Sequence, residues 1–250
     1  MTKNQHNHNE QSYDSDPEDE EEIRARKYSI IHDEVKNGQV VFISFDIETG
    51  GDDCGIVQLS SECFILSSNG DEGGGRRLKQ TFDLYMKPHE SAIWSKYATE
   101  IHGLHKNHPS IITADPLELV WEQFETYLND IIPIRHKGVL VAWNGETCDM
   151  EWCYRLMNGP NASISFPRHI RYFMDPLEII RRHTGCNFNP KKSKLQSLSL
   201  GSVYRYIHHS DLTGAHNSLI DAKAQTDVVL HPNFNGYWDK KHSVRTISSM

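Results

Sequence analysis

The sequence lacks long hydrophobic runs: no stretch approaches the ~18 consecutive apolar residues that a membrane-spanning helix needs. The opening residues, MTKNQHNHNEQSYDSD, contain no apolar segment of the kind that a secretory signal requires. The five cysteines include no Cys-x-x-Cys pair, which argues for reduced thiols and against a zinc site. These absences predict an intracellular protein, cytoplasmic or nuclear, that has no membrane partner.

The sequence also lacks an excess of basic residues, since its formal net charge is −8. Residues 1–22 hold eight acids and one lysine and so account for −7 of that charge. Residues 23–250 are nearly neutral, so their net charge does not exclude a polyanionic partner. Residues 1–27 have no periodic apolar positions, and we expect them to form a disordered acidic tail. We expect one folded domain over residues 28–236 and a C-terminal extension over residues 237–250.

One nearly unbroken apolar run, Val-Val-Phe-Ile-Ser-Phe, leads into Asp46 and Glu48 and stops at Thr49-Gly50-Gly51. It predicts a strand over residues 40–47 that is buried on both faces, at the centre of an α/β sheet. Because the side chains of a strand alternate, Asp46 and Glu48 point to the same side. They repel each other unless a cation lies between them. The alternative is a strand that ends at the solvent edge with two solvated acids.

The remaining apolar patterns predict a mixed α/β fold. Four further strands are expected over residues 56–66, 81–86, 138–143 and 170–174. Helices are expected over residues 115–131, after Asp149, over residues 194–206 and over residues 217–230. This order predicts a central five-stranded mixed sheet flanked by helices.

Two local patterns refine this prediction. Asp115 and Asp175 each precede a proline and, two residues further on, a glutamate, so both are interpreted as helix N-caps. Three basic residues, Arg76, Arg77 and Lys79, are assigned to the loop of a hairpin over residues 56–86, and Lys191, Lys192 and Lys194 to a later loop.

Two more acids fall at the ends of predicted elements. Asp149 follows the fourth strand, and Asp221 lies in the first turns of the last helix. With Asp46 and Glu48 they make four carboxylates without cysteine partners, the ligands that Mg²⁺ or Mn²⁺ prefers. Two such ions ~4 Å apart activate water and stabilise the leaving oxygen of a phosphodiester.

His216 lies five residues before Asp221, which places it on the loop before the helix and free to approach the acids. A histidine there can remove the proton from an attacking water, because its pKa lies near neutral pH. The alternative is a surface histidine at the start of a helix.

Three segments resemble the exonuclease motifs of DEDDh 3′–5′ exonucleases, the DnaQ-like branch of the ribonuclease H-like fold. They are Phe45-Asp46-Ile47-Glu48-Thr49-Gly50, Asn144-Gly145-x-x-Cys148-Asp149 and Ala215-His216-x-x-x-x-Asp221-Ala222. Ile101-His102-Gly103-Leu104 is similar to the His-Gly loop of the family, and Met174-Asp175-Pro176-Leu177 to its Asp-Thr-Leu segment. The resemblance extends over residues 38–231.

The resemblance implies a metal-dependent 3′–5′ exonuclease that hydrolyses phosphodiester bonds at nucleic-acid 3′ ends and releases nucleoside 5′-monophosphates. It implies two Mg²⁺ or Mn²⁺ ions on the four carboxylates Asp46, Glu48, Asp149 and Asp221, with His216 as general base. It also implies that the substrate, DNA or RNA, is contacted by Thr49, His102 and Asn144. The chain departs from the family pattern at Gly51-Asp52-Asp53, Trp143 and Cys148, and these departures concern substrate preference.

Two other interpretations stay open. One is a non-catalytic nucleic-acid-binding or interaction module that keeps the exonuclease fold. The other is a ribonuclease H-like endonuclease or a transposase-type domain, which shares the carboxylates. The His-x₄-Asp spacing disfavours the second of these.

Overall fold

The computed structural model describes residues 33–66, 75–158, 164–182, 195, 197–232, 234 and 244–247. The predictions for the acidic tail, for the turn after residue 66 and for Lys191, Lys192 and Lys194 lie outside these described residues.

Six strands form one mixed sheet in the order β3-β2-β1-β4-β5-β6. They are β1 (Val40–Thr49), β2 (Ile56–Leu66), β3 (Gly75–Tyr85), β4 (Lys137–Val141), β5 (Ile170–Met174) and β6 (Arg245–Thr246). β1 pairs antiparallel with β2 and parallel with β4, so it is central, as its apolar run predicts. The predicted mixed sheet is confirmed, and β6 adds a sixth strand by pairing antiparallel with β5.

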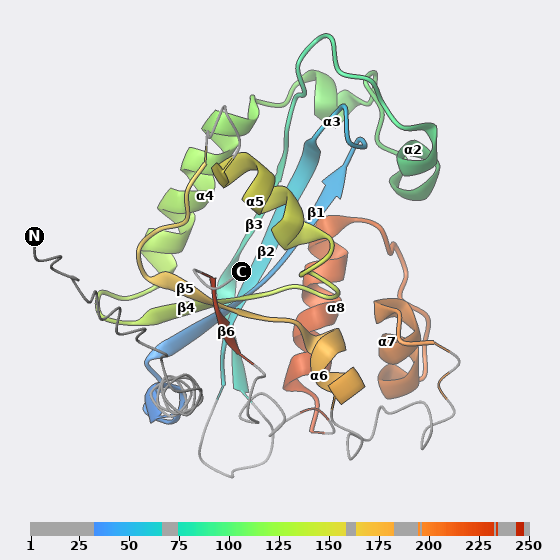
Figure 1. Ribbon diagram of the computed structural model, residues 1–250. Helices are drawn as coiled ribbons and strands as arrows, with labels where there is room; N and C mark the ends of the chain where they lie inside the picture. The colour runs from blue at the N-terminus through green and yellow to red at the C-terminus, as the bar shows by residue number, and fades with distance from the viewer. Residues whose placement is uncertain are drawn as a thin grey trace, which may run out of the picture.

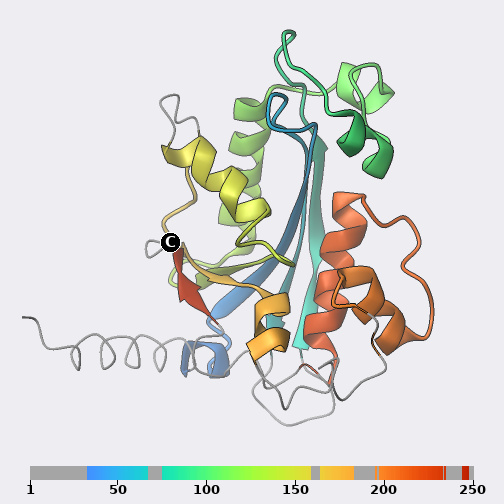
Figure 2. The same ribbon diagram turned by 45° about the vertical axis from the view of Figure 1, so that its right-hand side comes forward.

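Helices cover both faces of this sheet (Figures 1 and 2). α4 (Leu117–Ile131) and α5 (Asp149–Asn158) pack on one face, and α6 (Pro176–Arg182), α7 (Leu200–His208) and α8 (Ser218–Leu230) pack on the other. Two short helices, α2 (Lys96–His102) and α3 (Pro109–Ile112), lie in the segment between β3 and α4. Within the described part of the chain, no helix has the length and apolar character to span a membrane.

The two faces follow from the alternation of side chains along β1. Val41, Ile43 and Phe45 belong to the core with α4 and α5. Val40 and Phe42 belong to the core with α6, α7 and α8. All five side chains are at most 1% exposed, so β1 is buried on both faces as predicted.

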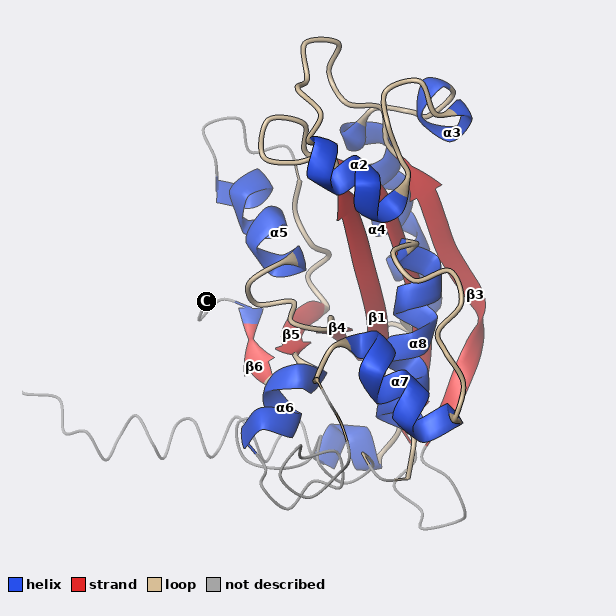
Figure 3. Ribbon diagram, turned by 90° about the vertical axis from the view of Figure 1, so that its right-hand side faces the viewer, coloured by secondary structure: helices blue, strands red, loops and turns tan. Residues whose placement is uncertain are grey.

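β1 also extends beyond its parallel neighbour. The pairing of β1 with β4 ends at Ser44 and Val141, whereas β1 continues to Thr49. Figure 3 shows β1 running past β4 and β5 towards α2. The last residues of β1 are therefore free of β4 on one edge, and this is where the predicted acids lie.

Three local predictions are wrong. Arg76, Arg77 and Lys79 lie in β3 rather than in a loop, because β3 begins at Gly75 and pairs with β2 there. The guanidinium of Arg77 binds Glu62 on β2 and Asp227 on α8, so distant acids compensate its charge.

The other two errors concern helix starts. Asp115 does not cap α4: its carbonyl accepts the N–H of Lys87 at 2.9 Å, and Pro116 is the N-cap without a side-chain bond. α7 begins at Leu200 and not at residue 194, since Ser199 caps it by accepting the N–H of Ser202.

Candidate active site

Three carboxylates meet at the end of β1. Asp46, Glu48 and Asp221 each offer one oxygen, and these oxygens all lie within 4.8 Å of one another. Asp46 and Glu48 share the face of β1 that α8 covers, and Asp221 lies in the first turn of α8. The side chain of Asn217 caps α8 at this point. The fold thus brings together acids that are 175 positions apart in the sequence.

Asp149, the first residue of α5, lies beside this group and is 4% exposed. Its Oδ1 accepts the backbone N–H of Ile47 at 3.0 Å. The group within 4.8 Å does not include Asp149, but the Asp149 charge raises the pKa of both Asp46 and Glu48. All four predicted carboxylates are therefore electrostatically connected.

Burial is the main cause of a raised pKa at each of these carboxyls. Burial, followed by the charges of Asp221 and Asp149, raises the pKa of Glu48 to about 8. Burial, followed by Asp149, Asp221 and Glu48, raises the pKa of Asp46 well above its usual range. Burial raises the pKa of Asp149 to about 7, although the Ile47 hydrogen bond opposes it. Oxygen ligands whose charges repel one another suit a divalent cation such as Mg²⁺ or Mn²⁺.

His216 lies on the loop before α8, as the five-residue spacing predicts. Its backbone has a φ of 65°, and its N–H donates to Asp221 Oδ2 at 2.8 Å. The side chain is exposed, and His216 partly opposes the burial that raises the pKa of Asp221 and adds to the burial that lowers the pKa of His102. His216 therefore lies beside Asp221 with its side chain open to solvent.

His102 ends α2 and fixes the end of β1. Its Nδ1 accepts the N–H of Leu104 at 3.0 Å, and its Nε2 lies 3.0 Å from the carbonyl oxygen of Thr49. Because Nδ1 is an acceptor, Nε2 carries the proton and donates to Thr49. Burial lowers the pKa of His102, in keeping with a neutral ring. Both ring nitrogens are thus engaged within the protein, where they position the Thr49 backbone.

No family model matches the sequence, and no curated protein matches it. The crystal structure of cell-death related nuclease 4 (CRN-4) matches with a TM-score of 0.57 at 17% identity, over 76% of this chain and 64% of that chain. The nuclease domain of 3′hExo, a DEDDh family member bound to rAMP, matches with a TM-score of 0.53 at 14% identity, over 83% and 94%. The chain shares the ribonuclease H-like fold of these two nucleases.

A third structure with this fold is that of a 3′-exonuclease in 3′-end specific recognition of a histone mRNA stem-loop. Its TM-score is 0.55 at 13% identity, over 91% of this chain and 74% of that chain. These identities are low, so the fold is common to the proteins while most side chains differ.

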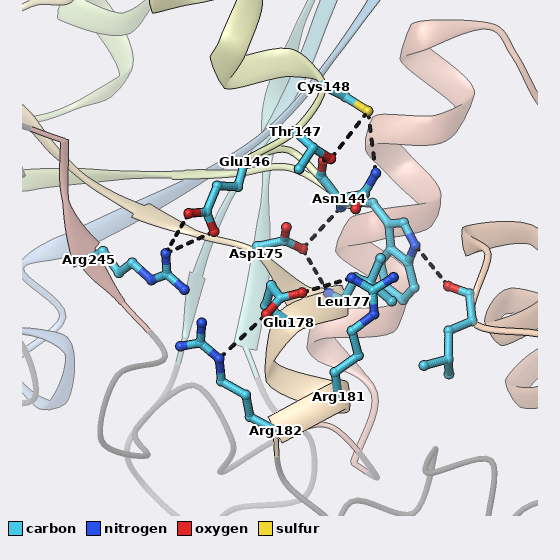
Figure 4. Close-up of polar contacts among 12 residues, drawn as sticks. Asn144, Glu146, Thr147, Cys148, Asp175, Leu177, Glu178, Arg181, Arg182 and Arg245 are labelled. Atoms are coloured by element: carbon cyan, nitrogen blue, oxygen red, sulfur yellow. Dashed lines mark hydrogen bonds and ion pairs between the residues drawn. The ribbon is translucent and has the colours of Figure 1, made fainter. Parts of the chain in front are cut away.

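Asn144 lies in the turn that leads from β4 to Asp149, with a φ of 57°. Its backbone N–H donates to Asp175 Oδ1 at 3.0 Å, and its side-chain amide contacts Cys148 Sγ at 3.4 Å (Figure 4). Asp175 Oδ1 also accepts the N–H of Leu177 at 2.9 Å, so the prediction that Asp175 caps a helix is confirmed. Asn144 thus orders the turn that carries Asp149.

Three contacts of this site gave no signal in the sequence. Arg245 on β6 donates to both carboxylate oxygens of Glu146 at 2.8 Å and holds the turn before Asp149 (Figure 4). Trp94 packs against Gly50, and Arg155 on α5 binds Asp52. Each partner lies more than 40 positions away in the sequence, so no local spacing could predict the pair.

Proposed function

We propose that this protein is a metal-dependent 3′–5′ exonuclease of the DEDDh type. It hydrolyses phosphodiester bonds at the 3′ ends of DNA or RNA and releases nucleoside 5′-monophosphates. The observation that carries this proposal is the group of Asp46, Glu48 and Asp221, with Asp149 beside it, at the end of the central strand. Two of the similar structures, one bound to rAMP and one of 3′-end specific recognition of a histone mRNA stem-loop, support a nucleic-acid substrate.

In this proposal, Asp46, Glu48, Asp149 and Asp221 hold two Mg²⁺ or Mn²⁺ ions. Such ions supply activation of the attacking water and stabilisation of the charge on the leaving oxygen. The protein supplies the orientation of the ligands. The Ile47 N–H holds the Asp149 carboxylate, and the His216 N–H holds that of Asp221.

His216 takes the proton of the attacking water on a neutral ring nitrogen. The water oxygen then bonds to phosphorus, and the bond from phosphorus to the 3′-oxygen of the preceding nucleotide breaks. The terminal nucleotide leaves as a 5′-monophosphate, and the departing 3′-oxygen takes a proton from solvent, so the shortened strand keeps a 3′-hydroxyl. The exposure of His216 next to Asp221 suits this role, because a base must reach both the site and the solvent.

The terminal nucleotide is placed by the end of β1 and the turn after β4. Thr49 contacts the nucleotide through its backbone. His102 holds this backbone in place through a hydrogen bond to the carbonyl oxygen of Thr49. Asn144 contributes by ordering the turn and by its amide, which points to Cys148. His102 therefore acts as a positioning residue for the substrate end.

The test is degradation of 5′-labelled single-stranded DNA and RNA with Mg²⁺ or Mn²⁺, with the released nucleotide identified. Asp46→Asn is expected to lower the rate about 100-fold or more, because loss of a mere outer-shell partner of a metal ligand already costs about 10–100-fold. Asp53→Asn is the control, because it removes an equal charge from the loop after β1, outside the carboxylate group. Full Mg²⁺-dependent activity of Asp46→Asn contradicts the proposal.

A matched pair of variants tests the role of His216. His216→Asn removes the base but keeps a residue that tolerates positive φ, and an ~100-fold loss is expected. His209→Asn makes the same change at a φ of 55° at the end of α7 and should keep full activity. Tight oligonucleotide binding without any metal-dependent cleavage indicates the non-catalytic module instead. Cutting of a circular substrate indicates an endonuclease.

We further propose an intracellular location, cytoplasmic or nuclear. The four cysteines in the described part of the chain, Cys54, Cys63, Cys148 and Cys153, are all free thiols, which supports a reducing compartment. Imaging of the tagged protein in its own cells tests this location.

A further inference from the structure

A pocket lies close to the end of β1, in the segment between β3 and α4. This segment, with α2 and α3, sits at the upper end of β1 and β2 in Figure 1. Its backbone is tied to the turn after β1: the Ser95 N–H donates to Gly50 at 2.7 Å, and the Ile93 N–H to Asp53 at 3.4 Å. The site is therefore linked to the residues that follow Thr49.

The site is a pocket of about 180 Å³, called the Trp94 pocket below. Its apolar part is formed by Ala92, Trp94, Ile111 and Ile112, and its polar rim by Lys87, His89, Glu90 and Lys106, with Pro88 between. Ile112 in the pocket is 55% exposed, so the apolar part of the pocket reaches solvent.

Trp94 is held in place by contacts within the protein. A Cβ at Gly50 would lie 3.1 Å from the indole ring, so the glycine lets the ring pack directly on the backbone after Thr49. Trp94 also packs against a small core formed by Val57, Leu104 and Ile111. The ring is thus fixed before any ligand binds, which lowers the entropic cost of stacking on it.

The rim is cationic. Among the described residues, neither Lys87 nor Lys106 forms an ion pair with a carboxylate. By contrast, Arg77, Arg155 and Arg245 each bind an acid. Two lysines free to bind an anion therefore flank a fixed tryptophan, with Glu90 as the one acid among the lining residues.

This combination fits one unpaired nucleotide. Complete small-molecule sites have volumes of about 300–1,000 Å³, so a pocket of about 180 Å³ takes a single ring system. Proteins bind single strands by stacking bases on aromatic rings while cations contact the phosphates. An aromatic ring with two free lysines supplies both kinds of contact.

We infer that the Trp94 pocket binds an unpaired nucleotide of the substrate strand, upstream of the 3′ end. Its base lies against Trp94, and its flanking phosphates lie near Lys87 and Lys106. That the bound strand is a substrate rests on the proposed function. That the pocket binds an unpaired nucleotide does not. A base held in a duplex cannot enter the pocket, so the site favours substrates whose single-stranded 3′ tail reaches it.

The test measures binding without cleavage, by fluorescence anisotropy of the full chain in EDTA. The probes are a labelled dinucleotide, a ten-nucleotide single strand and a blunt duplex of the same sequence. The double variant Lys87→Gln with Lys106→Gln, and separately Ile112→Glu, are expected to weaken binding of the ten-nucleotide strand about tenfold. The slope of log affinity against log salt should fall by about 1.4 in the double variant.

Two controls carry matching changes at the opposite end of the sheet, where β4 begins. Ile134→Glu matches Ile112→Glu, because Ile134 is 93% exposed, and Arg135→Gln removes a positive charge from the next residue. Neither should change the affinity for the ten-nucleotide strand. Trp94→Leu should weaken binding while Trp94→Phe retains it, since stacking needs an aromatic face, and thermal unfolding checks that both variants fold.

The pocket variants should leave the dinucleotide affinity and the weaker duplex affinity unchanged. Equal affinity of all variants for the ten-nucleotide strand overturns the inference, even if an acidic peptide binds the pocket. An equal loss for the dinucleotide also overturns it, because the variants then disturb the 3′-end site. If the wild-type chain shows no cleavage but the pocket-dependent affinity remains, the proposed function fails and the inference stands.

Discussion

Arg155 on α5 donates from Nη1 to Asp52 Oδ1 at 3.0 Å, and so ties the turn after β1 to the helix that begins at Asp149. The same guanidinium donates from Nε to Glu151 at 3.0 Å and lies over the ring of Trp152. The two elements that carry predicted metal ligands are thus joined by a cation whose charge two acids compensate. Asp52 belongs to the Gly51-Asp52-Asp53 stretch where the chain departs from the DEDDh pattern.

Asp52→Asn should strengthen substrate binding, because it removes an acid and leaves Arg155 freer to contact phosphate. We expect KM for a single-stranded oligonucleotide to fall by about 2- to 5-fold at low salt, and this effect to shrink at high salt. Asp53→Asn removes the same charge without releasing Arg155 and should have the smaller effect. If both variants behave alike, or if the gain survives in an Arg155→Gln background, the ion pair does not control binding.

Divalent metal should stabilise the fold. Because burial and mutual repulsion raise the pKa values of Asp46 and Glu48, a cation among these carboxylates removes an unfavourable interaction. We expect Tm to rise by about 5–10 °C at a metal concentration near 100 times Kd. Asp46→Asn should raise Tm in EDTA and abolish the metal-induced shift, as measured by scanning calorimetry. An unchanged shift in this variant would show that the metal binds elsewhere.

Asp175 should make stability depend on pH. Burial raises the pKa of Asp175 from 3.8 to about 6, so the folded state holds its proton more tightly than the unfolded state does. The stabilisation is complete below pH 4 and is lost as the pH rises through 6. Asp175→Asn keeps an oxygen acceptor for the Leu177 N–H but does not titrate. The free energy of unfolding of Asp175→Asn, relative to that of wild type, should therefore rise by on the order of 3 kcal/mol between pH 4 and pH 7.

Urea unfolding in EDTA at these two pH values measures that difference. Asp115→Asn serves as the control, since Asp115 is exposed and caps no helix. A constant difference between Asp175→Asn and wild type across this range would show that Asp175 is charged in the fold throughout.

Gly50→Ala should destabilise the protein and slow catalysis. A Cβ there would lie 2.8 Å from Cys54 Cβ and 3.1 Å from the Trp94 ring, so the turn after Thr49 must shift. We expect a loss of about 1–3 kcal/mol in unfolding free energy. Gly201→Ala is the control: nothing lies within 4 Å of its Cβ, and this helical site should gain about 0.5–1 kcal/mol. Equal stability of both variants would mean that Gly50 has room for a side chain.

The sequence by itself determined the bounds of two strands and the local placement of the candidate site residues. The strand over residues 56–66 has the predicted bounds, as does the strand over residues 170–174, because apolar β-forming runs end there at turn or cap residues. Alternation along β1 placed Asp46 and Glu48 on one side, and the five-residue spacing placed His216 on a loop. These are local properties, set by the geometry of a few neighbouring residues.

Only the tertiary structure decided between the local structures that one and the same sequence pattern can form. The same Asp-Pro-x-Glu pattern makes Asp175 a cap but not Asp115, because the Asp115 carbonyl accepts a hydrogen bond from Lys87 on a distant segment. The basic residues that were predicted in a loop lie in β3, where Glu62 and Asp227 compensate the charge of Arg77. The contact of Asp149 with the Ile47 N–H exists because β4 ends before β1 does. Each outcome depends on partners far away in the sequence, whose proximity is created by folding.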